Sequence, residues 1–209
     1  MSKENIHPIW RIASIVTLGL LRTRVRTKER VIYLTFDDGP HPEHTPKLLA
    51  LLRQFHARGS FFLVASECLK YESVVKQIVD DGHQIGNHSH THPIVQSLSS
   101  LAQWKEYSAA DQILAKVANC RPPFALRPPR GNITLAALIY GLFFSRQLCL
   151  WSRDSLDGEL SSREVCTAFL RKPIQGGDVL LFHDDSCVCI EALQVMLPEW
   201  QKNGFRFVA

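Results

Sequence analysis

The sequence predicts an α/β protein, a distorted or incomplete (β/α) barrel with about seven parallel strands. From residue 30 onward, short β-rich runs alternate with stretches whose apolar residues recur every three or four positions. This alternation is typical of βα units that form a mostly parallel sheet. Titratable residues also gather directly after several predicted strands, where barrels and open parallel sheets place their functional groups. An open doubly wound sheet is the alternative that the same pattern allows.

Seven short segments rich in β-branched and aromatic residues are predicted strands. In chain order they are 31–36, 60–64, 84–86, 124–127, 147–151, 178–182 and 205–208. The stretches between them are predicted helices, because a polar face accompanies an apolar stripe at helical spacing. In chain order these are 45–57, 70–82, 99–118, 133–143, 161–171 and 190–203.

The length of 209 residues suits one domain, which we place at residues 30–209 after an N-terminal extension of residues 1–29. We expect this extension to be helical, because Ile9–Leu21 is mostly apolar. Arg11 interrupts the run, which is shorter than the ~20 residues needed to span a bilayer, and no small-residue cleavage site follows clearly. We therefore expect a cytoplasmic protein whose N-terminal segment can touch a membrane surface.

Charge and cysteine content narrow the classes of partner. The net charge is +4, and lysine and arginine are spread along the chain except in residues 22–30. This stretch could touch an anionic lipid surface or a partner, but a charge run is more often a solvated segment. This mild charge does not indicate a nucleic acid partner. The six cysteines form no CxxC pair, so we expect reduced thiols rather than a zinc knuckle or a disulfide scaffold. The oligomeric state stays open.

Two adjacent carboxylates, Asp37 and Asp38, follow the predicted strand 31–36. Neighbouring side chains on an extended chain point to opposite sides, so we expect the two aspartates to have different roles. Gly39 and Pro40 then turn the chain sharply. Asp-Gly-Pro is also common turn chemistry, which would explain Asp38 without any catalysis.

Three of the nine histidines, His88, His90 and His92, lie within five residues after the predicted strand 84–86. A helical turn would bring His88 and His92 to one face, whereas an extended chain would bring all three to one side, and the spacing allows both. Imidazoles with one carboxylate suit Zn²⁺, Co²⁺ or a related ion and leave positions for water and substrate. Three solvated loop histidines are the alternative.

The predicted strands 124–127 and 178–182 are also followed by candidate functional groups. Prolines stiffen the segment RPPRG, which could aim a backbone N–H at a fixed point, and Arg127 offers a permanent charge to a carboxylate. Taken alone, this segment is more often a turn. In the later strand, Leu181 and His183 share one side, which places the histidine beside an apolar patch suited to a methyl group.

Taken in order, TFDDGP, HSHTH, RPPRG, the stretch Trp151–Gly158 and LLFHDD resemble the motifs of the polysaccharide deacetylases, the chitooligosaccharide deacetylase homology family (carbohydrate esterase family 4). The resemblance covers roughly residues 30–208. It implies a metal-dependent hydrolase that removes the N-acetyl group from an N-acetylated sugar or glycan of the GlcNAc type and releases acetate. An N-acetylated carbohydrate is then the expected partner.

The resemblance implies a role for each residue that matches a motif. Asp37 is the general base. The residues that bind a divalent metal are Asp38, His88 and His92, and His90 is left outside the metal shell. Zinc is the expected ion, while cobalt, manganese and nickel suit the same ligands. The remaining assignments are Arg127 to orient Asp37, the backbone amide of Arg130 to hold the oxyanion, His183 as general acid, Asp157 to tune His183, and Leu181 and Pro129 to bind substrate.

Two positions depart from the family pattern, which usually has tyrosine at Arg130 and tryptophan at Gly158. A backbone amide survives the first change, and the added positive charge would favour an anionic substrate. The second change removes an aromatic wall of the acyl pocket, so another side chain must help Leu181 or the pocket admits an acyl group larger than acetyl. A catalytically altered, binding-only member and a metal-free glycoside hydrolase are competing interpretations, and the histidine cluster disfavours the hydrolase.

Overall fold

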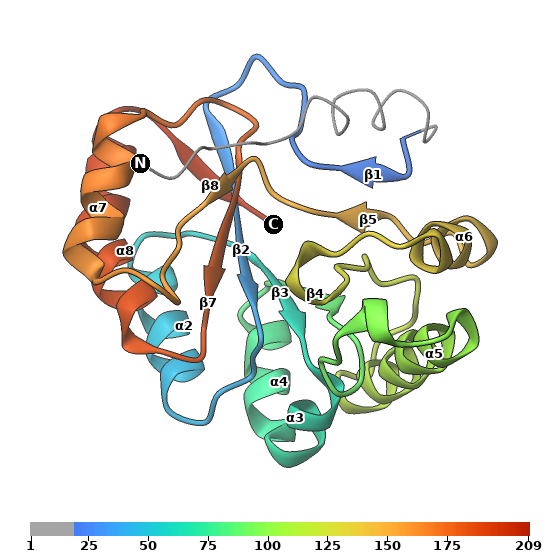
Figure 1. Ribbon diagram of the computed structural model, residues 1–209. Helices are drawn as coiled ribbons and strands as arrows, with labels where there is room; N and C mark the ends of the chain where they lie inside the picture. Colours follow the sequence, from blue (N-terminus) through green and yellow to red (C-terminus); the bar gives the residue numbers. More distant parts are fainter. Residues whose placement is uncertain (1–18) are drawn as a thin grey trace.

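The computed structural model describes residues 19–209, and Figure 1 shows parallel strands with helices packed around them. The expected N-terminal helix lies mainly outside these residues. Within residues 19–29 the structure differs from that expectation, because Leu21–Arg22 forms the short strand β1. The backbone is extended there since β1 pairs in parallel with β5 (Leu148–Cys149).

Six strands form the main sheet, in the order β4-β3-β2-β7-β6, with β8 paired to the first residues of β2. Every ladder in this sheet is parallel. The six strands are β2 (Val31–Asp37), β3 (Ser60–Leu63), β4 (Gln84–Asn87), β6 (Arg153–Asp154), β7 (Val179–His183) and β8 (Arg206–Val208). The central strand β2 therefore ends beside the ends of its two main neighbours.

Helices follow the strands and pack on their outer side, with α2, α7 and α8 on one flank and α5 and α6 on the other (Figure 1). The α-helices of the described chain are α2 (His44–Gln54), α3 (Ala65–Lys70), α4 (Glu72–Asp80), α5 (Ser100–Val117), α6 (Leu135–Phe143), α7 (Ser162–Arg171) and α8 (Cys187–Lys202). Short 3₁₀ turns occupy Val95–Ser97 and Pro129–Gly131. Helix α3 was not predicted, and Tyr71 separates it from α4. Among the described residues, no helix combines the length and the apolar character that crossing a membrane requires.

The two sheets together form an incomplete barrel. Leu126 makes isolated parallel bridges to Asn87 of β4 and to Leu148 of β5, which connects the main sheet to the β1–β5 pair. The described strands are parallel and do not close, which confirms the predicted α/β fold. The predicted strand 124–127 is reduced to this one bridged residue, because prolines without an N–H donor stand at 122, 123, 128 and 129.

Alternation along β2 separates the core from the functional end of the sheet. Ile32, Leu34 and Phe36 are fully buried in the main hydrophobic core, where the Phe36 ring packs on Phe61 at 4.8 Å between centroids. The side chain of Thr35, on the opposite face of the strand, bonds to Arg127 across the barrel interior. The same face continues to the last residue of β2, which is an aspartate.

Candidate active site

The predicted functional residues meet at the carboxyl ends of β2, β4 and β7. Asp37, the last residue of β2, is in register with His183, the last residue of β7, and His88 directly follows β4. The carboxyl ends of parallel strands meet at one edge of a sheet, so the topology itself gathers these side chains. They border a cleft of about 300 Å³, and the residues that line it are Asp37, Asp38, His88, His92, Arg130, Trp151, Asp154, Leu181 and His183.

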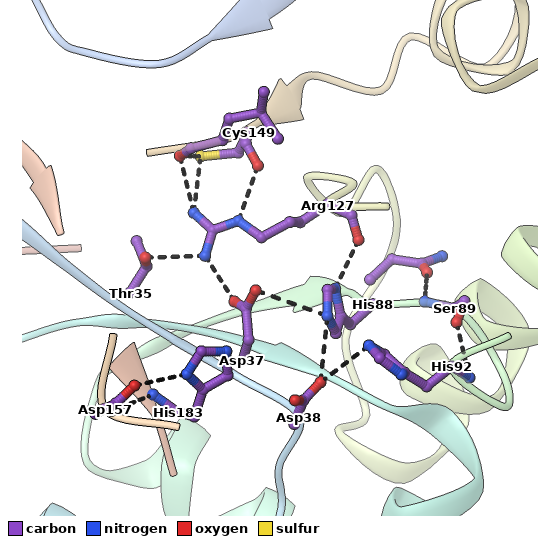
Figure 2. A network of polar contacts seen from close by, with 12 residues as sticks. Thr35, Asp37, Asp38, His88, Ser89, His92, Arg127, Cys149, Asp157 and His183 are labelled. Carbon is purple, nitrogen blue, oxygen red and sulfur yellow. Dashed lines mark hydrogen bonds and ion pairs between the residues drawn. The ribbon is translucent and has the colours of Figure 1, made fainter. Parts of the chain in front are cut away.

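One group in the cleft is suited to a divalent cation. The Oδ1 atom of Asp38 lies 3.4 Å from His88 Nε2 and 3.2 Å from His92 Nε2 (Figure 2). The candidate ligand atoms of the three residues all lie within 4.8 Å of one another. Asp38 Oδ1 is buried and has no hydrogen-bond partner, so its lone pairs are left for a cation between the two imidazoles.

Hydrogen bonds fix the ring of His88 in the form that a metal requires. Its Nδ1 atom lies 2.7 Å from the carbonyl oxygen of Arg127. A carbonyl oxygen can only accept, so Nδ1 carries a proton, and Nε2, which faces Asp38, is the ring atom that is left to bind a metal. Sequence spacing left a helical turn and an extended chain open, and the structure has neither, because Ser89 and His92 adopt positive φ values of 73° and 54°.

The surroundings of this group favour the ionised form of Asp38 and the neutral form of His92, which are the forms that bind a metal ion. Burial by itself raises the pKa of Asp38, but the neighbouring imidazoles of His88 and His92 outweigh it and lower the pKa to about 2. Burial lowers the pKa of His92, and the neighbouring His88 and the cation of Arg130 act in the same direction against the attraction of Asp38. A carboxylate and neutral imidazoles bind a metal ion without first releasing protons.

Asp37 has a different environment from its neighbour Asp38. It is 3% exposed, and its Oδ1 atom accepts a hydrogen bond of 2.6 Å from Nη1 of the fully buried Arg127. Arg127 is held in turn by the carbonyl oxygens of Cys149 and Leu150 and stacks 4.0 Å over the ring of Phe62. The guanidinium therefore keeps a permanent positive charge at one oxygen of Asp37 and fixes its orientation.

An extended chain would point the two aspartates to opposite sides, but in the structure they do not point to opposite sides. Asp38 has a φ of 72° and follows the end of β2, so the alternation of the strand no longer applies to it. Asp37 Oδ2 and Asp38 Oδ1 lie 3.6 Å and 3.4 Å from His88 Nε2. Asp37 thus places its free oxygen beside the candidate cation site, within reach of a water molecule bound there.

On the opposite side of the cleft, His183 is paired with the buried Asp157. Its Nδ1 atom lies 2.7 Å from Asp157 Oδ1, and its backbone N–H donates to Asp157 Oδ2. Burial lowers the pKa of His183, but the hydrogen bond and charge of Asp157, with the charges of Asp37 and Asp38, raise it overall to about 9. An imidazolium in this position can donate a proton from Nε2 at neutral pH.

The comparisons with known proteins agree with this geometry. The family model described as polysaccharide deacetylase matches residues 24–140, which is more than half of the chain. The chain belongs to the polysaccharide deacetylase family. This confirms the resemblance in the motifs.

Relatives of this polysaccharide deacetylase include Bacillus proteins that act on peptidoglycan, as their names state. A Bacillus cereus protein named peptidoglycan-N-acetylglucosamine deacetylase is 33% identical over 195 residues, covering 91% of each chain. The Bacillus subtilis peptidoglycan-N-acetylmuramic acid deacetylase PdaA is 29% identical over 87% of this chain and 70% of its own. The solved structure of the Bc1960 peptidoglycan N-acetylglucosamine deacetylase superimposes with a TM-score of 0.86 at 28% identity, covering 93% and 92% of the two chains.

The segment RPPRG forms a tight turn at the rim of the deacetylase cleft. Arg130 has a φ of 56° inside the 3₁₀ turn Pro129–Gly131, and its side chain is exposed at the cleft. Gly131, with a φ of 64°, lies so close to Trp151 that a Cβ there would meet the indole ring at 2.5 Å. Pro129 is buried in the turn and does not line the cleft, in contrast to Leu181.

Two cleft residues, Trp151 and Asp154, were not singled out individually in the sequence. Trp151 places an aromatic ring in the cleft. Gly158 has no side chain, and a Cβ added there would meet nothing within 4 Å, so the space beside it is open. Asp154 accepts a hydrogen bond from the N–H of Leu156. Burial raises the pKa of Asp154. This carboxyl therefore stabilises a turn and also borders the cleft.

Helix α5 holds the loop that carries the two histidines of the candidate metal site. Asn87 Nδ2 donates to Asp111 Oδ1 of α5 at 2.7 Å, and Asn87 Oδ1 accepts from the N–H of Ser89. Ser89 Oγ in turn accepts from the N–H of His92. Asp111 also forms a buried ion pair of 2.6 Å with Arg146. The chain of bonds runs from the core of the protein to a candidate metal ligand.

A second carboxylate on α5 supports the same loop from the outside. Glu106 accepts hydrogen bonds from the N–H groups of His90 and Thr91. These bonds turn the backbone of His90 toward α5, and His90 does not line the cleft. Glu106 and Asp111 were missed because, in the sequence, they are two acidic residues of an ordinary amphipathic helix.

Proposed function

We propose that this chain is a metal-dependent N-deacetylase that hydrolyses the acetamide of an N-acetylated sugar in a glycan, releasing acetate and a free amine. The observation that carries the proposal is the meeting of three kinds of group in one cleft. A cation-binding group faces a carboxylate with a permanent arginine partner, and an imidazolium stands opposite. These are the parts that amide hydrolysis at neutral pH needs.

Asp38, His88 and His92 would hold the divalent cation, whose chemistry there is to polarise the amide carbonyl and to lower the pKa of water from ~15.7 toward ~7. Asp37 accepts the proton of the attacking water through the oxygen that Arg127 leaves free. Zinc is the ion we propose, because neutral imidazole with one carboxylate is a borderline ligand set, and cobalt, manganese and nickel share this preference.

The other side of the cleft completes the hydrolysis. His183 donates its Nε2 proton to the departing sugar nitrogen, and Asp157 stabilises the imidazolium until then. The turn at Arg130 presents a backbone amide to the oxygen that becomes negative. Leu181 and the Trp151 ring supply apolar surface for the acetyl methyl group.

The substrate we propose is a glycan of peptidoglycan or chitooligosaccharide type, which relatives named after these substrates support. The exposed cation of Arg130 at the rim of the cleft favours a sugar that carries a carboxylate, as N-acetylmuramic acid does. Open space at Gly158 favours an N-acyl group longer than acetyl as a second candidate. A strict preference for acetyl across a series of N-acyl sugars would exclude that candidate.

The decisive experiment measures acetate release from N-acetylated chitooligosaccharides and from peptidoglycan fragments. Chelator should abolish release, added metal should restore it in the parent protein, and Asp38→Ala should stay inactive in both conditions. Asp80→Ala, which removes an exposed carboxylate on α4, is the matched control and should behave as the parent. Tight metal binding without acetate release from any substrate would contradict the proposed reaction and support a binding-only protein.

A further inference from the structure

Helix α6 carries an exposed apolar surface that the deacetylase site does not use. Half of the ten large exposed hydrophobic residues of the described chain lie on it or on the adjoining start of α5. We call this surface the α6 face, and its members are Leu101, Leu135, Leu142, Phe143 and Phe144. Leu135 is 72% exposed and Phe143 is 76% exposed. Exposed apolar groups gathered in this way mark an interaction surface.

Contacts between α5 and α6 join these side chains into one patch. The ring of Trp104, one turn after Leu101, lies 6.1 Å from the rings of both Phe143 and Phe144. Its indole N–H donates to the carbonyl oxygen of Ala136 in α6. The patch therefore extends across two helices rather than along a single exposed turn.

The first residues of the described chain lie beside the α6 face. The carbonyl oxygen of Leu20 accepts from the N–H of Leu148, and a Cβ added to Gly141 of α6 would lie 3.2 Å from Leu20 Cδ1. Leu20 and Leu21 pack in the hydrophobic cluster that contains Tyr140. Leu20 and Leu21, the last residues of the apolar run 9–21 in the sequence, thus lie on this side of the molecule.

The stretch of sequence that contains α6 carries cations but no acidic residues. Between Asp111 and Asp154 the sequence has no aspartate or glutamate, and Asp111 itself is buried against Arg146. Apart from Arg130 at the cleft, the exposed cations in this stretch are Lys116 and Arg121, and Arg22 and Arg26 are exposed in and after β1. Apolar side chains bordered by cations suit the surface of a bilayer that contains anionic lipids.

We propose that the α6 face binds the surface of a membrane containing anionic lipids, with Leu142 and Phe143 entering the headgroup region. A second copy of the chain fits this face less well, because a symmetric contact would bring its cations against themselves. Helices α5 and α6 each follow a strand position of the parallel sheet, so their C-terminal ends lie at the edge away from the cleft. Binding at Phe143 would leave the cleft open to substrate, and it does not depend on the deacetylase activity.

The test is co-sedimentation of the full chain with vesicles of phosphatidylcholine alone or mixed with phosphatidylglycerol. The parent should bind the mixed vesicles, and added salt should weaken this binding. The double variant Leu142→Ser with Phe143→Ser should bind about tenfold or more weakly, because two apolar side chains no longer enter the interface. Leu170→Ser on α7, where the parent residue is 63% exposed, is the matched control and should bind as the parent does.

Three results would overturn the proposal: no vesicle binding by the parent, equal binding by the double variant, or a parent dimer that the double variant dissociates. The last result, seen by light scattering after size exclusion, would assign the face to a second copy. Thermal melts of the variants control for folding, and Leu135→Ser at the other end of α6 provides an independent variant that should also weaken binding. Acetate release from soluble chitooligosaccharides should be the same in every variant.

Discussion

The two sides of the cleft are built in different ways. On the side of β2 and β4, the candidate metal ligands and Asp37 are held by a buried arginine and by a chain of hydrogen bonds from α5. On the side of β7, His183 depends on a single partner, Asp157. The first side fixes the positions of several atoms at once, whereas the second mainly sets the pKa of one group.

This difference fits the chemistry that we propose for each side. A metal site requires several ligand atoms at defined distances, so each ligand needs its own support. A general acid needs one hydrogen-bonded orientation and a suitable pKa, which one buried carboxylate can provide. We therefore expect substitutions on the first side to change metal affinity or the water-activating step, and those on the second to change the pH dependence.

The largest effect should come from Asp37→Asn. The amide keeps the size of the side chain and the contact with Arg127, but it cannot take a proton from water, so kcat should fall by about 10²- to 10⁴-fold. Metal affinity, measured by competition with a chromogenic chelator, should change little because Asp38, His88 and His92 remain. Asp38→Asn should show the reverse pattern, with weakened metal binding, and equal loss of metal in both variants would contradict separate roles.

Asp157→Asn should impair the general acid on the side of β7 without changing the candidate metal site on the side of β2 and β4. Asp157 holds the pKa of His183 at about 9, so the imidazole is protonated, and active as an acid, below that pH. A bound divalent cation lowers this pKa, so the alkaline limb of the activity profile should lie below pH 9 in the metal-loaded enzyme. In the variant this limb should move to lower pH and kcat should fall by about 10²-fold. Activity profiles with parallel metal titrations check this, and an unmoved limb with lowered metal affinity would contradict the assignment.

Asn87→Ala should weaken the hydrogen bonds that hold the histidine loop on the side of β2 and β4. The substitution removes both the bond to Asp111 and the bond from the buried N–H of Ser89, while the Asp111–Arg146 ion pair remains. Supports of this kind change metal affinity by about 10- to 100-fold, and the unpaired N–H should lower stability by about 1–3 kcal/mol.

Metal titration and thermal melts of the Asn87 variant separate the two effects. Asn203→Ala removes an exposed amide after α8 and is the matched control, with metal affinity equal to that of the parent. An Asn87→Ala protein that is less stable but binds metal as tightly as the parent would show that α5 only stabilises the fold.

The sequence predicted the groups of the cleft better than their supports. Strand-end motifs identified Asp37, His88 and His183, because consecutive residues with reactive side chains leave a local signal and parallel strands then gather them at one edge. Asp111 and Glu106 leave no such signal, since their roles depend on contacts with residues 15 to 24 positions away.

The same limit explains the errors in the fold. The predicted strand 124–127 has suitable composition, but its ladder is limited to Leu126 by prolines on both sides. The paired strand β1 arises from residues that looked like the end of an apolar helix, because pairing with β5 outweighs local helical preference. Backbone conformations such as the positive φ of Asp38 and His92 depend on the assembled site and cannot be deduced from spacing.

The smallest effect should come from Glu106→Gln, which tests whether the outer support of the histidine loop matters as much as the buried one. Glutamine keeps one acceptor oxygen for the N–H groups of His90 and Thr91 but loses the charge that strengthens both bonds. The difference between a charged and a neutral acceptor is about 0.5–1.5 kcal/mol, so metal affinity should fall about two- to tenfold, less than in Asn87→Ala. An effect in Glu106→Gln as large as that of Asn87→Ala would mean that the exposed bonds from Glu106 position the histidine loop as strongly as the buried bonds of Asn87 do. The stronger support of the metal side, compared with the single partner of His183, would then not result from buried hydrogen bonds.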